Sequence, residues 1–314
     1  MNTHTLKGLR QQFKAVGKFH TPPELVATIT ALAKQNLHGE PRNVYDPTCG
    51  AGDLLAAWGD TPKYGQDIDQ EALDDAEAAL TNFTGVHGDT LANPAFMDKR
   101  FHVIVANPPF SIKWEPTVDE RFMTTPTIPT KSKADYAFIL HILHLLDDDG
   151  VAVVMGFPGI LYRGGREGKI RAWLVEENLI SHVVRIPGGK FEDTSIETCI
   201  LVFKKCRRST SVQFIDMEHD LTEVVDRKQI QAEGYNLSVH TYVQPAEPEE
   251  EPVDEVALQE QARSQMLQHL RSDLEVDAMI CRIAGFTDHG EYLDRIVRLV
   301  EEHAHGMTQE HEHD

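Results

Sequence analysis

The sequence lacks the features that mark several classes of protein. Its four cysteines lie far apart and form no CxxC pair, which argues against a zinc knuckle or a disulfide framework and favours a reducing compartment. No apolar run reaches membrane-spanning length, and the first residues begin neither a signal peptide nor a transit peptide. The histidines near the C-terminus are typical of a polar tail. We therefore expect a cytoplasmic protein with no membrane segment and no metal centre.

Positive charge is also scarce. The chain has 30 Lys and Arg against 50 Asp and Glu, a net charge of −20, which by itself argues against a nucleic-acid partner. The acid is concentrated, however: residues 241–314 hold 18 acidic and 5 basic side chains, a net of −13, which leaves −7 for residues 1–240. The total charge therefore says little about the surface of the main domain.

Composition changes near residue 244. We predict a main domain over residues 1–243 that begins with a short helix, an acidic linker over residues 244–255, and an acidic helical tail over residues 256–314. Apolar residues recur at helical spacing in two stretches of the tail: Ala262, Met266, Leu270 and Leu274, then Leu293, Ile296, Val297 and Val300. Two such helices cannot bury their apolar faces alone, so the tail is a candidate docking element for a partner.

A buried strand over residues 101–106 opens into Asn107-Pro108-Pro109-Phe110. The two prolines fix successive φ angles and force Asn107 out of the helical region. The Asn107 side chain and the Pro108 carbonyl can then present two oxygens to one point, with the Phe110 ring beside it. Two acceptors next to an aromatic face suit the exocyclic amine of a flipped base. A proline-rich turn with a core phenylalanine is the alternative interpretation.

Acidic residues end the three strands expected before this one. Asp46 precedes the glycine turn 47–52, Asp67 ends the second strand, and Asp89 ends a third strand placed at residues 85–90. Ligands of open α/β sheets gather at this edge. The turn lacks the Lys-Ser/Thr pair of a P-loop, and an acidic edge suits a cationic ligand with an amino-acid moiety, such as S-adenosylmethionine. Asp67 stands where a ribose is held, and Asp89 could accept from an adenine amine.

Other segments allow two interpretations. Thr21 is a plausible N-cap of a helix that starts at Pro22, with Glu24 completing a capping box, or the segment lines a small-molecule pocket. Phe191, in a glycine loop, is either a second stacking face or a loop anchor. His141 and His144, on a helix over residues 135–146, are expected at the surface. Residues 212–216 are predicted to extend the sheet at one edge.

Six motifs occur in order between residues 15 and 243: Phe19-His20-Thr21-Pro22, Asp46-Pro47-Thr48-Cys49-Gly50-Ala51-Gly52, Tyr64-Gly65-Gln66-Asp67-Ile68-Asp69, Asn107-Pro108-Pro109-Phe110, Leu161-Tyr162-Arg163-Gly164-Gly165-Arg166-Glu167-Gly168 and Tyr235-Asn236-Leu237-Ser238. Together they resemble the modification (M) subunit of type I restriction-modification systems, an adenine-specific DNA methyltransferase. The resemblance implies an α/β fold with a Rossmann-like, seven-stranded, mostly parallel sheet that binds S-adenosylmethionine, followed here by a small helical appendage.

The resemblance also implies roles for residues. The catalytic set would be Asn107, Pro108, Pro109 and Phe110, with Phe110 and Phe191 stacking on the base. The cofactor-binding set would be Phe19, Thr21, Asp46, Pro47, Thr48, Gly50, Gly52, Asp67, Ile68, Asp89 and Asn107. The family has Glu where this chain has Asp67, one methylene shorter, and its long N-terminal helical domain has no counterpart here.

The implied partners are double-stranded DNA and a separate specificity subunit, a second copy of the chain, or both. Nothing between Cys206 and Asp314 is large or basic enough to read a DNA sequence. Two rival functions stay open: methylation of an RNA base or a protein glutamine, and a catalytically silent regulatory subunit. Intact Asp46, Asp67, Asn107 and Phe110 argue against the silent subunit.

Overall fold

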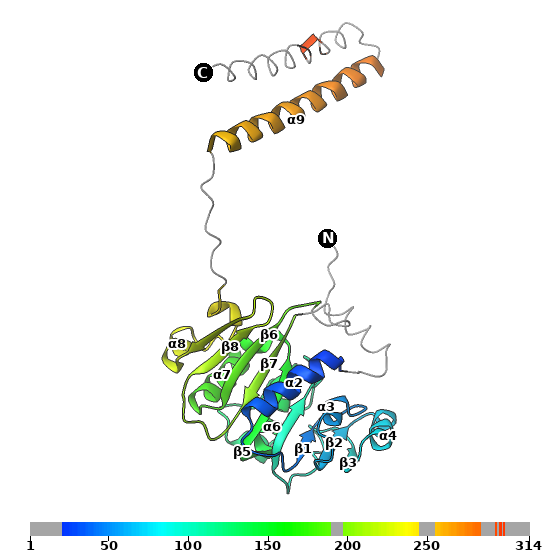
Figure 1. Cartoon of the computed structure of the whole chain (residues 1–314), viewed down its shortest axis with the longest axis vertical. Helices are drawn as coiled ribbons and strands as arrows, with labels where there is room; N and C mark the ends of the chain where they lie inside the picture. The colour runs from blue at the N-terminus through cyan, green and yellow to red at the C-terminus, as the bar shows by residue number, and fades with distance from the viewer. Residues whose placement is uncertain are drawn as a thin grey trace. The chain divides into compact units, whose positions relative to one another are not determined.

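A computed structural model of the chain describes residues 21–189, 197–244 and 255–283, and residues 293, 295, 296 and 298. Phe19, Phe191 and the short helix expected at the N-terminus lie outside the described residues. The chain divides into two compact parts, Met1–Pro245 and Ala246–Asp314. The first part contains the sheet (Figure 1).

The described residues form a nine-stranded sheet in the order β3-β2-β1-β4-β5-β7-β6-β8-β9. Strands β1 to β5 run parallel where they pair, and β7 is antiparallel to both of its neighbours, β5 and β6. The strands are β1 (Val44–Asp46), β2 (Lys63–Asp67), β3 (Phe83–His87), β4 (Phe101–Ala106), β5 (Leu146–Gly156), β6 (Ile180–Ile186), β7 (Thr198–Phe203), β8 (Val212–Asp216) and β9 (Leu221–Val225).

The seven strands from β3 to β6 confirm the predicted mostly parallel sheet, but the expected total of seven was too small. Strand β8 pairs in parallel with β6 and is the predicted extension of the sheet, although β9 and not β8 lies at the edge. Strand β9 pairs antiparallel with β8 and was not predicted. Three of its five residues are exposed, so the strand carries no apolar run that would mark it in the sequence.

Helices cover both faces of the sheet (Figure 1). One core cluster joins α2 (Pro23–Asn36), α3 (Asp53–Ala56) and α4 (Gln70–Ala79) to the sheet, and the other joins α6 (Asp135–Leu145) and α7 (Gly165–Glu176) to the opposite face. Alternate residues of β4 enter the two clusters, which is why the strand reads as a continuous apolar run. The shorter helices are α5 (Glu120–Met123), η1 (Pro158–Leu161), α8 (Arg227–Ala232) and η2 (Val239–Thr241).

Helix α2 begins one residue later than predicted. Pro22 is its N-cap, Pro23 is its first residue, and no side chain caps it, so the assignment of Thr21 as N-cap with a capping box at Glu24 was wrong. The physical reason is that Thr21 is engaged elsewhere, with Asp53 and Asn107. The apolar face was predicted correctly, because Leu25 and Ile29 are fully buried.

The second part of the chain contains α9 (Glu255–Ile283), which confirms the first amphipathic helix expected there. Met266, Leu270 and Met279 are among its exposed apolar side chains. Within the described residues, no helix combines the length and hydropathy needed to cross a membrane.

Candidate active site

The carboxyl ends of the parallel strands bring the predicted residues to one edge of the sheet. Asp46 is the last residue of β1, Asp67 is the last residue of β2, and Asn107 follows β4. Because β1 pairs with both β2 and β4, these three positions lie on neighbouring strands. Asp89 differs from the prediction: β3 ends at His87, so Asp89 stands two residues beyond the strand, in the loop that follows. Gly88, at φ 154°, makes the turn between them.

The glycine turn after β1 is attached to β2 by its main chain. Gly50 has φ 49°, and its N–H donates to Asp67 Oδ2 at 2.7 Å. The Cys49 N–H donates to the Gln66 carbonyl at 3.0 Å. Gly52 has φ 88°, and a Cβ there would lie 2.6 Å from Leu80 Cδ1, so a larger residue would be strained and would displace the Leu80 side chain. The turn therefore holds the half-buried backbone of Thr48, Gly50 and Ala51 in a fixed position at the start of α3.

Asp46 makes the edge strongly acidic. The side chain is 2% exposed, and its Oδ1 accepts from the Thr48 N–H at 2.9 Å. Burial first, and then the negative charges of Asp67 and Asp53, raise the pKa of Asp46 to about 8, against the opposing effect of the hydrogen bonds from Thr48. A buried carboxyl beside two other acids favours a cationic ligand, since a positive charge would stabilise its ionised form.

Asp67 and the residue after it present different surfaces. Asp67 Oδ2 holds the glycine turn, and its Oδ1 accepts from the Asp69 N–H at 2.9 Å. Ile68, between them, exposes 68% of its surface. The pair thus combines carboxylate lone pairs with an apolar contact.

The loop that carries Asp89 is also fixed at several points. Asp89 accepts from the N–H groups of Leu91 and Ala92, and Thr90 donates its hydroxyl to the Pro47 carbonyl. Arg121, on α5, donates to the carbonyls of Thr90 and Leu91 at 3.0 and 2.8 Å. The loop is therefore tied both to the end of β1 and to α5.

Asn107 is joined to the start of α2. Its Nδ2 donates to Thr21 Oγ1 at 3.4 Å, and the Thr21 N–H donates to Asp53 Oδ2 at 2.8 Å. The hydrogen bond between Asn107 and Thr21 spans 86 residues of sequence and brings two predicted site residues together. Because the amide nitrogen is used by Thr21, the Asn107 oxygen is oriented away from that contact. Pro108 is buried, while Phe110 is half-buried against the core and keeps part of its ring accessible.

His141 contradicts the prediction of a surface position. It is 0% exposed, its Nδ1 lies 3.4 Å from Arg121 Nη1, and its Nε2 lies 3.1 Å from the Tyr45 hydroxyl. A guanidinium can only donate, so Nδ1 accepts and the proton of the neutral ring is on Nε2. Burial first, and then the positive charge of Arg121, lower the pKa of His141 to about 3. The signal in the sequence was the apolar character of α6 on all sides, which is typical of a buried helix.

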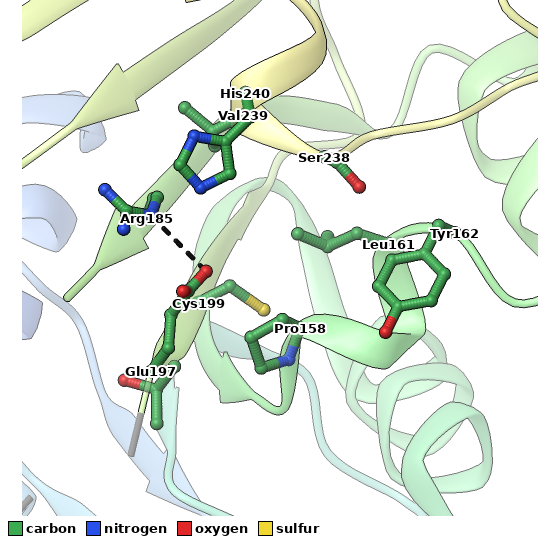
Figure 2. A pocket seen from close by; sticks show the side chains of 10 residues that line it. Pro158, Leu161, Tyr162, Arg185, Glu197, Cys199, Ser238, Val239 and His240 are labelled. Atoms are coloured by element: carbon green, nitrogen blue, oxygen red, sulfur yellow. Dashed lines mark ion pairs between the residues drawn. The ribbon is translucent and has the colours of Figure 1, made fainter. Parts of the chain in front are cut away.

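A small pocket lies at the same edge of the sheet but uses residues that the sequence analysis did not assign to a site (Figure 2). Arg185 from β6 forms an ion pair with Glu197 at 3.4 Å on one side. Leu161, Tyr162 and Ser238, from two of the motifs quoted above, line it as well. None of the acidic residues of the cofactor set lines this pocket.

Comparison with known proteins identifies the family. The model of the N-6 DNA methylase family matches residues 5–224, more than two thirds of the chain. The chain belongs to the N-6 DNA methylase family. This match contains the glycine turn, the acidic strand ends and the Asn107–Phe110 segment, so the geometry described above is that of a family member.

Curated relatives of this chain are methylase subunits of type I restriction enzymes. The MpnII methylase subunit of Mycoplasma pneumoniae is 31% identical, over 77% of this chain and 55% of that protein. The EcoEI methylase subunit of Escherichia coli is 29% identical, over 64% of this chain and 45% of that protein. The chain thus spans about half the length of the curated relatives that it matches.

Solved structures agree on the fold. The methyltransferase subunit of a type I restriction-modification system from Streptococcus thermophilus superposes with a TM-score of 0.66 at 28% identity, over 72% of this chain and 60% of that one. The EcoKI M protein superposes with a TM-score of 0.53 at 19% identity, over 69% of this chain and 53% of that one. The sheet described here is therefore the one found in these methyltransferase subunits.

Proposed function

We propose that this chain transfers the methyl group of S-adenosylmethionine to the 6-amino group of an adenine flipped out of double-stranded DNA, as the methylase subunit of a restriction-modification system. The observation that carries the proposal is the meeting of two sets of groups on neighbouring strands. The acidic glycine-turn edge stands at the end of β1, and the Asn107–Phe110 acceptor segment stands at the end of β4. A cofactor bound at the glycine-turn edge would face an amine bound by the acceptor segment.

The residues present fit this cofactor. Asp46 lies in an acidic, buried setting that a positively charged amino group would relieve. Gly50 lets the ligand approach the main chain, Gly52 lets the turn pack against Leu80, and Pro47 and Thr48 complete the turn. The Asp67 carboxylate accepts two hydrogen bonds, from Gly50 and Asp69. A carboxylate has about four lone-pair sites for accepting hydrogen bonds, so Asp67 can still accept one from a ribose hydroxyl. Ile68 and Asp89 would contact the adenine of the cofactor.

The sulfonium supplies an electrophilic methyl group, and the protein must activate the amine. The lone pair of an adenine amine is delocalised into the ring, which makes it a weak nucleophile. Asn107 Oδ1 and the Pro108 carbonyl accept its two N–H bonds and favour a pyramidal nitrogen as positive charge develops. Thr21 orients the Asn107 amide by accepting its Nδ2–H, and Phe110 holds the base by stacking. The proton leaves after attack, so no strong base is required.

We assign sequence reading to a separate subunit. Residues 1–240 carry a net charge of −7, and the exposed apolar residues of α9 include Met266, Leu270 and Met279. A helix with exposed apolar residues gains from burial against a partner. Membership of a DNA methylase family favours DNA over RNA or protein as the substrate class, and the intact edge residues favour an active subunit over a silent one.

The proposal is tested by methyl incorporation from labelled S-adenosylmethionine into unmethylated duplex DNA, with the product nucleoside identified by mass. We expect N(6)-methyladenine. Asn107→Ala should lower turnover by about 10²–10³-fold because an acceptor for the developing charge is lost, while cofactor affinity stays within about threefold. Asn36→Ala is the matched control: this half-buried amide bonds the Leu32 carbonyl on α2, and its loss should leave turnover unchanged.

Other outcomes separate the rival functions. Cofactor binding without a methylated product, in the presence of candidate specificity subunits, would favour an RNA or protein substrate. A chain that binds no cofactor would refute the enzyme and favour a silent subunit.

A further inference from the structure

The turn that follows Phe110 has a backbone conformation that needs support. Ser111 has φ 52°, in the left-handed region that residues with a Cβ rarely adopt. Such conformations persist when the surrounding structure holds them, and they cluster where geometry matters for function. Because Ser111 is bonded directly to Phe110, its conformation decides the direction in which the chain leaves the aromatic ring.

The support comes from the start of α6. The Ser111 N–H donates to Asp135 Oδ1 at 3.1 Å, and the Ala134 N–H donates to the Ile112 carbonyl at 2.8 Å. These two hydrogen bonds hold the two residues that follow Phe110. Asp135 is only 6% exposed, and it is the first residue of a helix that is buried on nearly every side. The acceptor is therefore rigid and shielded from water, which strengthens its hydrogen bond.

Asp135 stands in the first turn of α6, where the helix dipole favours an acid, and its hydrogen-bond partner lies outside the helix. The N-cap of α6 is Ala134, and no side chain caps the helix, so the Asp135 carboxylate is directed to Ser111 rather than to a free N–H of its own first turn. A buried carboxyl is costly unless its hydrogen bonds offset the loss of water. The bond from the Ser111 N–H fixes the chain before the φ torsion of Ser111, and the bond to the Ile112 carbonyl fixes it after that torsion.

We infer that Asp135 is a positioning residue for the methyl transfer. It acts through Ser111: its carboxylate holds the turn at positive φ, and the turn holds the Phe110 ring where the target adenine stacks. Asp135 itself touches neither the base nor the cofactor. The inference rests on the proposed function, since it assigns to Phe110 the role of a stacking face.

The test compares removal of the acceptor with its conservative replacement. Asp135→Ala should lower kcat by about 100-fold, the effect expected when a reacting group is misplaced by about 1 Å. The dissociation constant for S-adenosylmethionine should change less than about threefold, because the acidic edge is untouched. Asp135→Asn keeps an oxygen that accepts from Ser111, so its kcat should stay within about fivefold of wild type.

A second substitution makes the test specific to the turn. Glycine adopts positive φ without strain, so Ser111→Gly needs no acceptor to hold the turn. Combined with Asp135→Ala, it should restore kcat by about tenfold or more, which a merely structural role for Asp135 would not produce. Asp226→Ala is the matched control: this carboxylate accepts from the Lys228 N–H at 2.8 Å at the start of α8, so its loss should lower stability and leave kcat unchanged.

Each outcome decides the inference. A kcat for Asp135→Ala equal to that of wild type, or a double variant no faster than Asp135→Ala, overturns it. A fall in kcat matched by Asp226→Ala overturns it too, because loss of stability would then explain the effect. If the wild-type enzyme methylates adenine, these results leave the proposed function standing; a wild-type chain that transfers nothing to adenine overturns both.

Discussion

The unusual ionisation of Asp46 gives a prediction that does not depend on knowing the DNA site. Asp46→Asn keeps the shape of the side chain, and the amide oxygen can still accept from Thr48, but the charge is lost. The carboxyl is 2% exposed, and its pKa is raised from 3.8 to about 8, first by burial and then by Asp67 and Asp53. Without ligand, the folded protein therefore holds a proton at this position that the unfolded chain releases.

The sign of the effect follows from proton linkage. The folded state binds more protons than the unfolded state between pH 4 and pH 8, so the contribution of Asp46 to the free energy of unfolding is complete below pH 4 and falls as pH rises toward 8. The slope is about 1.4 kcal/mol per pH unit, and the whole shift corresponds to roughly 6 kcal/mol. The amide of Asp46→Asn does not titrate, so the variant should lack this slope.

Urea denaturation at pH 5, 6, 7 and 8 measures the difference between the two proteins. We expect the stability of wild type to fall relative to Asp46→Asn over this range. Parallel pH profiles for the two proteins would refute the argument, because they would show that Asp46 ionises normally in the folded state. The same result would remove the electrostatic reason for a cationic ligand at this edge.

Cofactor binding should reverse the effect. A positive charge beside Asp46 favours its ionised form, so S-adenosylmethionine binding at pH 7 should release a proton. Titration calorimetry in two buffers with different ionisation enthalpies counts that proton. Asp46→Asn should release fewer protons and bind roughly tenfold more weakly, the effect of losing a hydrogen bond to a charged group.

Two further predictions concern the packing of the site. Gly52→Ala should cost about 1–3 kcal/mol of stability in urea denaturation and weaken cofactor binding in calorimetry, since φ is 88° and the new Cβ would lie 2.6 Å from Leu80 Cδ1. Gly59→Ala, at φ 52° with open space around it, is the control, which should cost less stability and leave cofactor binding unchanged. If Gly52→Ala bound the cofactor as tightly as wild type, the turn would not have the role in cofactor binding assigned to it. His141, with a pKa lowered to about 3, stays neutral in the folded state, so the free energy of unfolding should fall as pH drops from 6.5 toward 4. His141→Asn should flatten this pH dependence in urea denaturation. An unchanged pH dependence in the variant would argue against a neutral His141.

The positions that the sequence predicted well are those fixed by local pattern and sheet geometry. An apolar strand followed by Asp or by Asn-Pro-Pro can be identified without any knowledge of contacts, and the carboxyl ends of parallel strands meet at one edge. Asp46, Asp67 and Asn107 lie at that edge as expected. Asp89 was displaced because Gly88 ends the pairing of β3 early, and a strand boundary is the least certain part of such a prediction.

The positions that it missed depend on partners far away in the sequence. His141 became buried because Tyr45 and Arg121, 96 and 20 residues away, satisfy both of its ring nitrogens. Nothing in the local pattern distinguishes a solvent-exposed histidine on α6 from a buried one whose ring nitrogens are hydrogen-bonded by such partners. Only the apolar character of the helix on nearly all sides indicated that α6 has no solvent-exposed face.

Thr21 and Asp135 show why capping signals and site signals are confused. Each stands at the start of a helix, where Thr and Asp usually bond the free N–H groups of the first turn, a local interaction that contributes about 1 kcal/mol. In this fold neither does so: Thr21 accepts from Asn107, and Asp135 accepts from Ser111, on the two sides of Pro108-Pro109-Phe110. Tertiary contacts of similar strength have replaced both caps. A capping residue whose helix is uncapped in the structure is therefore a candidate for a role in the site, and these two residues hold the acceptor segment from both ends.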